Sequence, residues 1–107
     1  MIDLVGIQIE IEEWRRRNFP GSSANQQLFG IVEELGELCH SILKQEQGIR
    51  TNENHIAKER DAIGDMLIFL LNYCSFRDYI LENIIRDTWK EVSQRDWIKY
   101  KKDGVSE

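Results

Sequence analysis

The stretch "ERDAIGDMLIFLLNYC", residues Glu59 to Cys74, indicates a helix that from Ala62 onward has almost no polar face. Asp65 lies inside this run and is flanked by isoleucine, methionine and leucine. An isolated carboxylate that is taken out of water costs several kcal/mol, even after the protein relaxes around it. The stretch therefore predicts a partner that offsets the charge of Asp65. The candidates are a buried Arg or Lys, a helix N-terminus of a second chain, or a bound metal ion.

Apolar residues recur at helical spacing, and no segment alternates polar and apolar residues as a half-buried strand does. We expect helices at about residues 3–17, 23–46, 52–77 and 78–102, within a single domain of residues 1–107. The fold class is therefore all-α, and the expected architecture is an antiparallel bundle of about four helices. Outside the stretch quoted above, the predicted core stripes are Leu4, Ile7, Ile11, Trp14; Leu28, Ile31, Leu35, Leu38, Ile42; and Leu81, Ile85, Trp89, Val92.

The composition, 41% hydrophobic and 31% charged residues with a formal net charge of −5, is that of a soluble globular domain. This charge argues against binding of a nucleic-acid polymer, because affinity for a phosphate backbone rests on excess Lys and Arg. The longest apolar run, residues 66–71, is too short to span a bilayer, and the N-terminus lacks the features of a signal peptide. Cys39 and Cys74 fall on apolar helix sectors, so we expect reduced core cysteines in a cytoplasmic protein without a membrane partner.

Two groups of carboxylates lie on successive predicted helices. Glu33, Glu34 and Glu37 lie within about 100° of one another on an ideal helix, a pattern that an ordinary solvated surface also produces. Asp61 and Asp65 are four residues apart and share a face of the next helix. If the two faces meet, their carboxylate oxygens form a site for Mg²⁺, with Mn²⁺ as a substitute, and the metal offsets the charge of Asp65.

These residues resemble the all-α NTP pyrophosphohydrolases, specifically the stand-alone MazG-like branch. That family has the pattern EExxE on one helix and ExxD on the next. Here "EELGE" (Glu33 to Glu37), within "QQLFGIVEELGEL", is similar to the first part, and "IGDMLIFLLNY" resembles the second helix with Asp65 as the aspartate. The segment "TWKEVSQRDW", Thr88 to Trp97, also looks like the C-terminal helix of the family, so the resemblance spans nearly the whole chain.

The chain departs from the family pattern at one position. The glutamate of ExxD is expected at position 62, where this chain has Ala62. Asp61 shares the face of Asp65 and is the favoured replacement, whereas Glu59 points about 120° away from Asp65 on an ideal helix. The identity of the fourth ligand and the number of metal ions therefore stay open.

The resemblance implies Mg²⁺-dependent hydrolysis of a nucleoside triphosphate, canonical or modified and expected to be a dNTP, to the monophosphate and pyrophosphate. Such an enzyme would clear unwanted nucleotides from the cellular pool. The candidate metal ligands are Glu34, Glu37, Asp61 and Asp65, and Glu33 with Glu34 would orient or deprotonate the attacking water.

The resemblance also implies contacts with the substrate. The candidate substrate-binding residues are Trp14, Asn18 and Phe19 at the end of the first helix, Asn72 on the third, and Lys90 and Arg95 on the fourth. Each has an ordinary alternative: Trp14 fits a core stripe, Asn72 is compatible with a buried amide, and Lys90 and Arg95 with exposed helix charges. The run Arg15–Arg17 is expected to be a solvated last turn that complements the helix dipole. Lys44 and Lys58 are unremarkable in the sequence and are not assigned to the site.

Two other functions fit parts of the sequence. His40 follows Glu37 at the spacing of the Glu-x-x-His motif of di-iron bundles, but Ile68 stands where Asp65 would need the second histidine. Ala62 keeps open a non-catalytic helical interaction module with a relict acidic site.

The apolar surface of the predicted helices exceeds what one small chain can cover. It includes a group of residues at the ends of the third and fourth helices: Tyr73, Phe76, Tyr79, Ile80, Trp89 and Trp97. We therefore expect a homo-oligomer. The resemblance implies a dimer or a tetramer, with nucleotide sites near the subunit interfaces.

Overall fold

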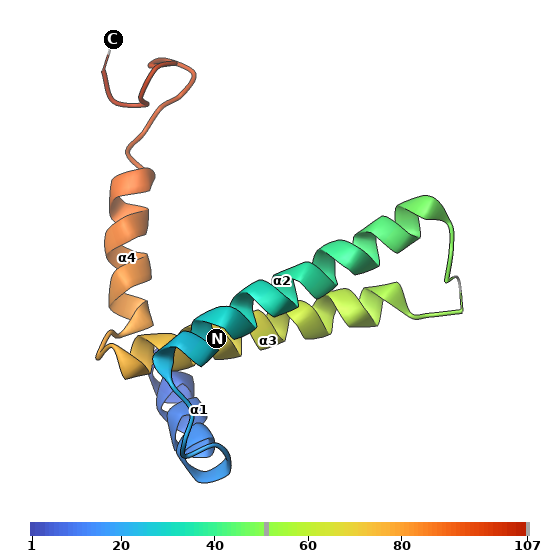
Figure 1. Cartoon of the computed structure of the whole chain (residues 1–107). Helices are drawn as coiled ribbons and strands as arrows, with labels where there is room; N and C mark the ends of the chain where they lie inside the picture. The colour runs from blue at the N-terminus through green and yellow to red at the C-terminus, as the bar shows by residue number, and fades with distance from the viewer. Residues whose placement is uncertain (51, 107) are drawn as a thin grey trace.

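The computed structural model describes residues 1–50 and 52–106, which form an all-α fold (Figure 1). Its four helices are α1 (Leu4–Asn18), α2 (Ala24–Gln47), α3 (His55–Phe76) and α4 (Leu81–Val92). The predicted all-α class with about four helices is therefore confirmed. Within the described residues no helix is both long and apolar enough to cross a membrane.

Helices α2 and α3 form a long antiparallel hairpin (Figure 1). Its helix ends follow from local sequence signals. Ser23 and Gln26 form a reciprocal capping box at the start of α2, and Gly48 ends α2 in the left-handed region with φ 70°. The side chain of Asn54 accepts the backbone N–H of Ala57 at the start of α3, which therefore begins three residues later than expected. Thr51, in the connection, lies outside the described residues.

Helix α1 packs against the C-terminal part of α3 and is joined to the start of α4 by the buried side chain of Gln8. The Nε2 group of Gln8 donates to the carbonyl of Tyr79 at 2.9 Å and to Ser75 Oγ at 3.2 Å. Its Oε1 atom accepts the backbone N–H of Leu81, the first residue of α4, at 3.1 Å. One glutamine thus satisfies polar groups on both sides of the α3–α4 turn, including a first-turn amide that no side chain of α4 caps.

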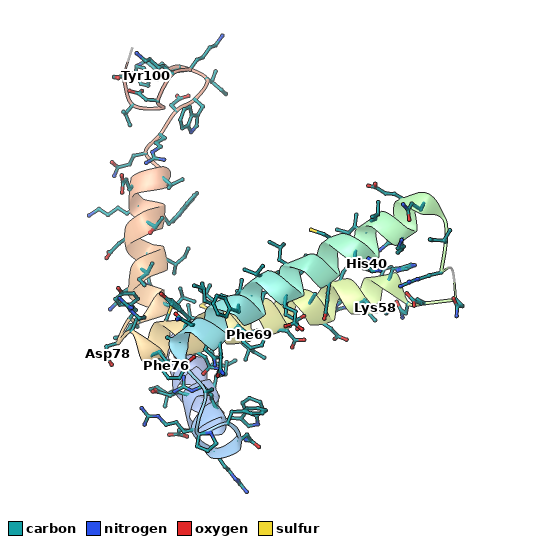
Figure 2. The ribbon with its side chains drawn as sticks, viewed as in Figure 1. His40, Lys58, Phe69, Phe76, Asp78 and Tyr100 are labelled. Carbon is teal, nitrogen blue, oxygen red and sulfur yellow. The ribbon has the colours of Figure 1, made fainter. Side chains whose placement is uncertain are left out.

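The predicted fourth helix, residues 78–102, is wrong in extent, because α4 spans only Leu81–Val92. Ser93 donates its hydroxyl to the carbonyl of Lys90, and Asp96 accepts the backbone N–H groups of Ile98 and Lys99. Such local side-chain bonds offer the backbone an alternative to the helix. The chain then folds back, and the Asp96 amide donates to the carbonyl of Gly104 at 2.7 Å. The segment after α4 leads to Tyr100, far from the hairpin (Figure 2).

The core of a single chain is small. Among the described residues, the buried hydrophobic ones are Ala62, Leu71 and Cys74, whereas Cys39 is exposed, contrary to expectation. The predicted stripe on α2 does not face a core within the chain, since Leu28, Leu35 and Ile42 are 41%, 48% and 41% exposed. The stripe on α4 is also uncovered beyond Leu81, with Ile85, Trp89 and Val92 exposed.

The molecule is extended because α4 projects away from the hairpin (Figure 1). Its radius of gyration is 17.8 Å, whereas a compact domain of this length has about 13 Å. The stripes predicted for α2 and α4 consist of apolar residues at helical spacing, but the described residues leave much of each stripe uncovered.

Candidate functional site

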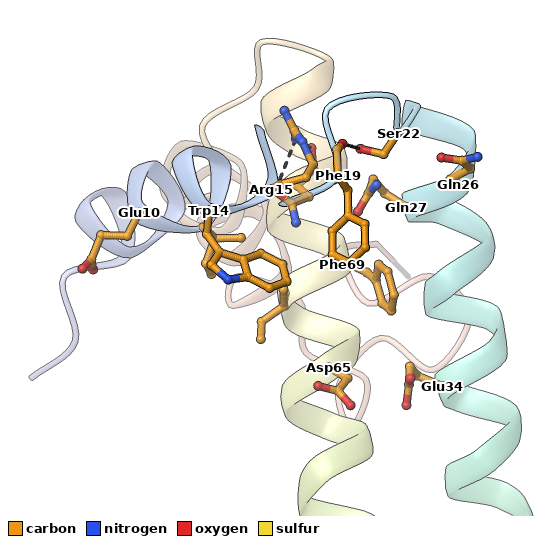
Figure 3. A pocket seen from close by; sticks show the side chains of 13 residues that line it. Glu10, Trp14, Arg15, Phe19, Ser22, Gln26, Gln27, Glu34, Asp65 and Phe69 are labelled. Atoms are coloured by element: carbon orange, nitrogen blue, oxygen red, sulfur yellow. Dashed lines mark hydrogen bonds between the residues drawn. The ribbon is translucent and has the colours of Figure 1, made fainter. Parts of the chain in front are cut away.

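Two adjoining cavities lie along the hairpin. The aromatic cavity, of about 860 Å³, is bordered by α1, the α1–α2 connection, α2 and α3, and includes Trp14, Phe19 and Phe69. The acidic cavity, of about 570 Å³, lies between α2 and α3 farther toward the hairpin tip. Glu34 and Asp65 line both cavities. Figure 3 shows these two carboxylates on facing helices, below the rings of the aromatic cavity.

The acidic cavity brings together every carboxylate that the sequence singled out as a metal ligand or catalytic group. These are Glu33, Glu34, Glu37, Asp61 and Asp65. Small side chains bring the two helices together beside it. Gly30 and Ser41 of α2 and Ala62 of α3 are all buried. A Cβ atom on Gly30 would lie 2.6 Å from the ring of Phe69, so only glycine permits this approach of the two helices.

The pKa of Glu34 is raised above its ordinary value. Partial burial is the largest cause, and the neighbouring carboxylates of Glu37 and Asp65 add to it, followed by that of Glu33. A cation bound beside Glu34 would offset the neighbouring negative charges that raise its pKa. The donor set consists of carboxylate oxygens, which suits Mg²⁺ or Mn²⁺.

The carboxylates do not converge on a single point. No three acidic, histidine or cysteine side chains among residues 1–50 and 52–106 are arranged to hold a metal ion as they stand. The residues present fit Mg²⁺ in their chemistry and in the cavity that they share, and the ion would draw their side chains together.

The burial predicted for Asp65 is wrong for the single chain, in which the residue is exposed and lines both cavities. The neighbouring apolar residues that suggested burial, Ile63, Leu67 and Ile68, are exposed too, at 48%, 50% and 39%. The helix has the apolar character that was expected, but its own chain leaves much of it uncovered.

Of the two candidates for the missing glutamate, Asp61 lines the acidic cavity and Glu59 does not. Glu59 instead accepts a hydrogen bond from Gln45 Nε2 at 2.8 Å. Ala62 also borders the cavity but is buried against α2. The arrangement favours Asp61 as the fourth carboxylate of the site.

Two cations of the acidic cavity were missed. Lys44 and Lys58 line it together with His40, and Figure 2 shows His40 and Lys58 along the same stretch of the hairpin. Lys58 pairs with Glu53 at 2.9 Å, and Lys44 donates to Gln47 at 3.1 Å. Their spacing carried the signal, because Lys44 follows Glu37 by two helical turns and Lys58 precedes Asp65 by two turns.

Three predicted substrate contacts, Trp14, Phe19 and Asn72, line the aromatic cavity. The rings of Trp14 and Phe19 meet edge to face with their centroids 5.6 Å apart. Trp14 is 53% exposed, so it belongs to the cavity wall and not to a core. Asn18 does not reach the cavity: its Nδ2 donates to the carbonyl of Trp14, and it borders a separate hollow on α1.

Arg15 corrects the expectation of a fully solvated Arg15–Arg17 turn. Its side chain is buried, with the guanidinium carbon 3.8 Å from the centroid of the Phe76 ring. The Nη1 group donates to the backbone and side-chain oxygens of Asn72 at 3.4 and 3.3 Å. Arg16 is exposed and pairs with Glu12 at 2.8 Å. Successive helical residues point about 100° apart, so one of three consecutive arginines has to face α3.

Lys90 and Arg95 do not reach either cavity of their own chain. Lys90 lies in the last turn of α4, and Arg95 lies beyond that helix, where it pairs with Glu91 at 3.4 Å. The assignment of Arg95 to the fourth helix is wrong for the same reason that α4 is shorter than expected.

Comparisons with known proteins found no match among family models, curated proteins or solved structures.

Proposed function

We propose that this chain is a Mg²⁺-dependent nucleoside triphosphate pyrophosphohydrolase, the activity implied by its resemblance to the MazG-like family. The observation that carries the proposal is the junction of the two cavities at Glu34 and Asp65. A nucleotide has an aromatic end and a polyanionic end. Its base fits the aromatic cavity, and its triphosphate then extends over the acidic cavity.

The chemistry assigns roles to the acidic cavity. Glu34, Glu37, Asp61 and Asp65 would hold the metal, which when bound offsets the negative charge of the phosphates. Glu33, or Glu34 where it is not used as a ligand, accepts a proton from the attacking water. The water oxygen bonds to the α-phosphorus, the bond from that phosphorus to the α–β bridging oxygen breaks, and pyrophosphate leaves with its electrons. Lys44 and Lys58 are suited to hold phosphate oxygens.

The decisive experiment is a panel of NTPs and dNTPs, assayed with Mg²⁺ or Mn²⁺ and with separate detection of pyrophosphate and orthophosphate. The proposal expects pyrophosphate and the nucleoside monophosphate in equal amounts, with dNTPs preferred. Orthophosphate as the first product would overturn the reaction class. No turnover of any nucleotide would favour the non-catalytic interaction module that Ala62 left open.

The proposed enzyme is a homo-oligomer. The chain exposes 8489 Å², whereas a folded monomer of its mass exposes about 6,200 Å². The excess of about 2,300 Å² exceeds the roughly 800 Å² that each partner buries in a standard interface and suits an obligate assembly. We propose a dimer or a tetramer of such dimers, located in the cytoplasm, where the nucleotide pool is.

The assembly also offers a role for α4. The exposed stripe of Ile85, Trp89 and Val92 is suited to pack on a second copy. Lys90 and Arg95, which lie away from the cavities of their own chain, would approach a nucleotide only through such a contact.

A further inference from the structure

Asn72 is the most enclosed polar side chain of the aromatic cavity, with 2% of its surface exposed. Its Oδ1 atom accepts a hydrogen bond from Arg15 Nη1. A guanidinium carries only donors, so it accepts neither of the two amide hydrogens. Arg15 therefore fixes which end of the Asn72 amide turns toward it and leaves the Nδ2 end for the cavity.

The hydrogen bonds of Asn72 with the described residues use its oxygen atoms and not its Nδ2 group. Among the described residues only His55 Nε2 is both fully enclosed and without a partner, so Asn72 Nδ2 keeps a small accessible surface at the cavity that Asn72 lines. Arg15 is itself 5% exposed and held over Phe76, so the pair is rigid. The closest carboxylate, Glu12, is 3.9 Å from Arg15 Nη2 and is paired at 2.8 Å with Arg16. Neutralising a carboxylate therefore does not explain the burial of Arg15.

Gln27 presents the opposite polarity to the same cavity. It is 5% exposed, and its Nε2 group donates to the carbonyl of Ser23 at 3.4 Å. Its Oε1 atom accepts no hydrogen bond from the described residues, and Gln27 lines the cavity with Asn72. The cavity thus offers a fixed donor from α3 and an acceptor from α2 beside the rings of Trp14 and Phe19.

We propose that Asn72 Nδ2 and Gln27 Oε1 read the hydrogen-bonding edge of a heteroaromatic base, and that Arg15 is the positioning residue that orients Asn72. This inference rests on the proposed function, which it deepens by naming how the base is selected. The base must present an acceptor to Asn72 and a donor to Gln27. A planar apolar group of the same shape would leave both amides unpaired, and sites of this kind reject such analogues strongly.

The test compares the best dNTP of the panel with a triphosphate that carries a non-hydrogen-bonding isostere of the same base, such as difluorotoluene for thymine. For the natural chain we expect KM for the isostere to be higher by at least about tenfold, with kcat little changed. Equal KM values for the two compounds would overturn the inference. This comparison needs no variant.

Asn72→Asp provides the matched variant. It keeps an oxygen facing Arg15 and adds a charge that the guanidinium stabilises, but it replaces the cavity-facing donor by an acceptor. We expect a folded protein with an unchanged or higher Tm, in which KM for the natural dNTP rises by about tenfold or more toward that of the isostere. Retention of the full discrimination in Asn72→Asp would contradict the proposal.

The role of Arg15 is tested by the ratio of the KM values for the isostere and the natural dNTP, and not by activity alone. Arg15→Met frees the Asn72 amide to turn over and should reduce the KM ratio between isostere and base, and Arg15→Lys should restore part of it. Arg16→Met, one residue along the same helix but exposed, is the control that should leave the ratio unchanged. An unchanged ratio in Arg15→Met would show that Asn72 needs no positioning.

Equilibrium binding of both triphosphates without added metal separates this inference from the proposed function. If the chain binds the natural triphosphate more tightly than the isostere but releases no pyrophosphate, the proposed enzymatic function is wrong and the inference about base recognition stands. If both triphosphates are hydrolysed and bind equally well, the enzymatic function stands and the inference about base recognition is wrong.

Discussion

At the scale of single residues, Glu34 is the carboxylate of the site whose pKa is raised. It is half-buried where the two cavities meet, and its raised pKa reflects that burial and the nearby charges of Glu37 and Asp65. In the folded chain without metal, the ionised form of Glu34 is therefore less favourable than in the unfolded chain. Such a group opposes folding at neutral pH and becomes useful when a cation binds.

Glu34→Gln is expected to reduce kcat by roughly 100-fold or more, because it removes a proposed metal ligand. Without metal it should raise Tm at pH 7. The folded-state pKa of Glu34 lies above its unfolded value, so the stabilising contribution of this carboxyl is present below the unfolded pKa and is lost as pH rises through the folded pKa. The gain in Tm should therefore shrink as pH falls below the ordinary range of glutamate. Thermal scans from pH 4 to pH 8 measure this, and a gain that grows toward acid would contradict it.

Asp61 and Glu59 form a matched pair for the fourth ligand, since the cavity contains the first and Gln45 binds the second. Asp61→Asn should weaken metal affinity by about 10- to 100-fold, whereas Glu59→Gln should change it less than about twofold. Calorimetric titration with Mn²⁺ compares the two. The reverse order would move the site about half a turn toward the hairpin tip.

At the scale of helices, the close approach of α2 and α3 depends on Gly30. Gly30→Ala should cost about 1–3 kcal/mol in the free energy of unfolding, because the new methyl group meets the ring of Phe69. The displaced ring would also intrude on the aromatic cavity, so KM for the nucleotide should rise.

Gly36→Ala on the same helix is the control. A Cβ atom there meets nothing within 4 Å, and the change should stabilise the chain by up to about 1 kcal/mol. Urea unfolding of both variants decides it, and equal effects would remove the special role of Gly30.

Helix periodicity explains what could be predicted at this scale. Residues three and four apart share a face, so the carboxylates of α2 and α3 could be placed on one site before any coordinates. The inward turn of Arg15 could not, because the three arginines look alike until the direction of α3 is known. The end of α4 was missed for another reason: no glycine or proline stands between Val92 and Gly104 to mark it, and hydrogen bonds of Ser93 and Asp96 end the helix instead.

At the scale of the whole molecule, one side of the hairpin is acidic and the other is apolar. The apolar side carries Leu28, Leu35 and Ile42 of α2 and Ile56, Ile63 and Leu67 of α3, all of them exposed. The core stripe of α2 was predicted from its spacing, but a sequence pattern does not tell whether the covering surface comes from the same chain. The excess exposed area and the extended shape are the two observations that support the proposed assembly with another copy.

Sedimentation at micromolar concentration should therefore show a dimer or a tetramer and not a monomer of 12.7 kDa. Leu35→Asp tests the surface directly. In a monomer, a charge at a side chain that is 48% exposed changes the free energy of unfolding by about 0.5 kcal/mol or less. In the proposed assembly it should dissociate the subunits and lower Tm strongly. Asn25→Asp adds the same charge at the start of α2 and should leave the assembly intact. A fully active monomer would refute both the assembly and the shared site.

Gln8, which joins α1 to the first turn of α4, couples the position of α1 to the direction of α4. Gln8 lies toward one end of this rigid helix, and Trp14 and Arg15, which border the aromatic cavity, lie toward the other. If the proposed nucleotide shifts α1, it also changes the direction in which α4 leaves the molecule. In the proposed assembly, the subunit that α4 contacts would then affect the pocket by the same amount, since coupling between binding sites is reciprocal. Plots of activity against nucleotide concentration for the assembled protein should accordingly show a Hill coefficient different from one. Gln8→Ala removes the hydrogen bond between α1 and α4 and should return the coefficient to one.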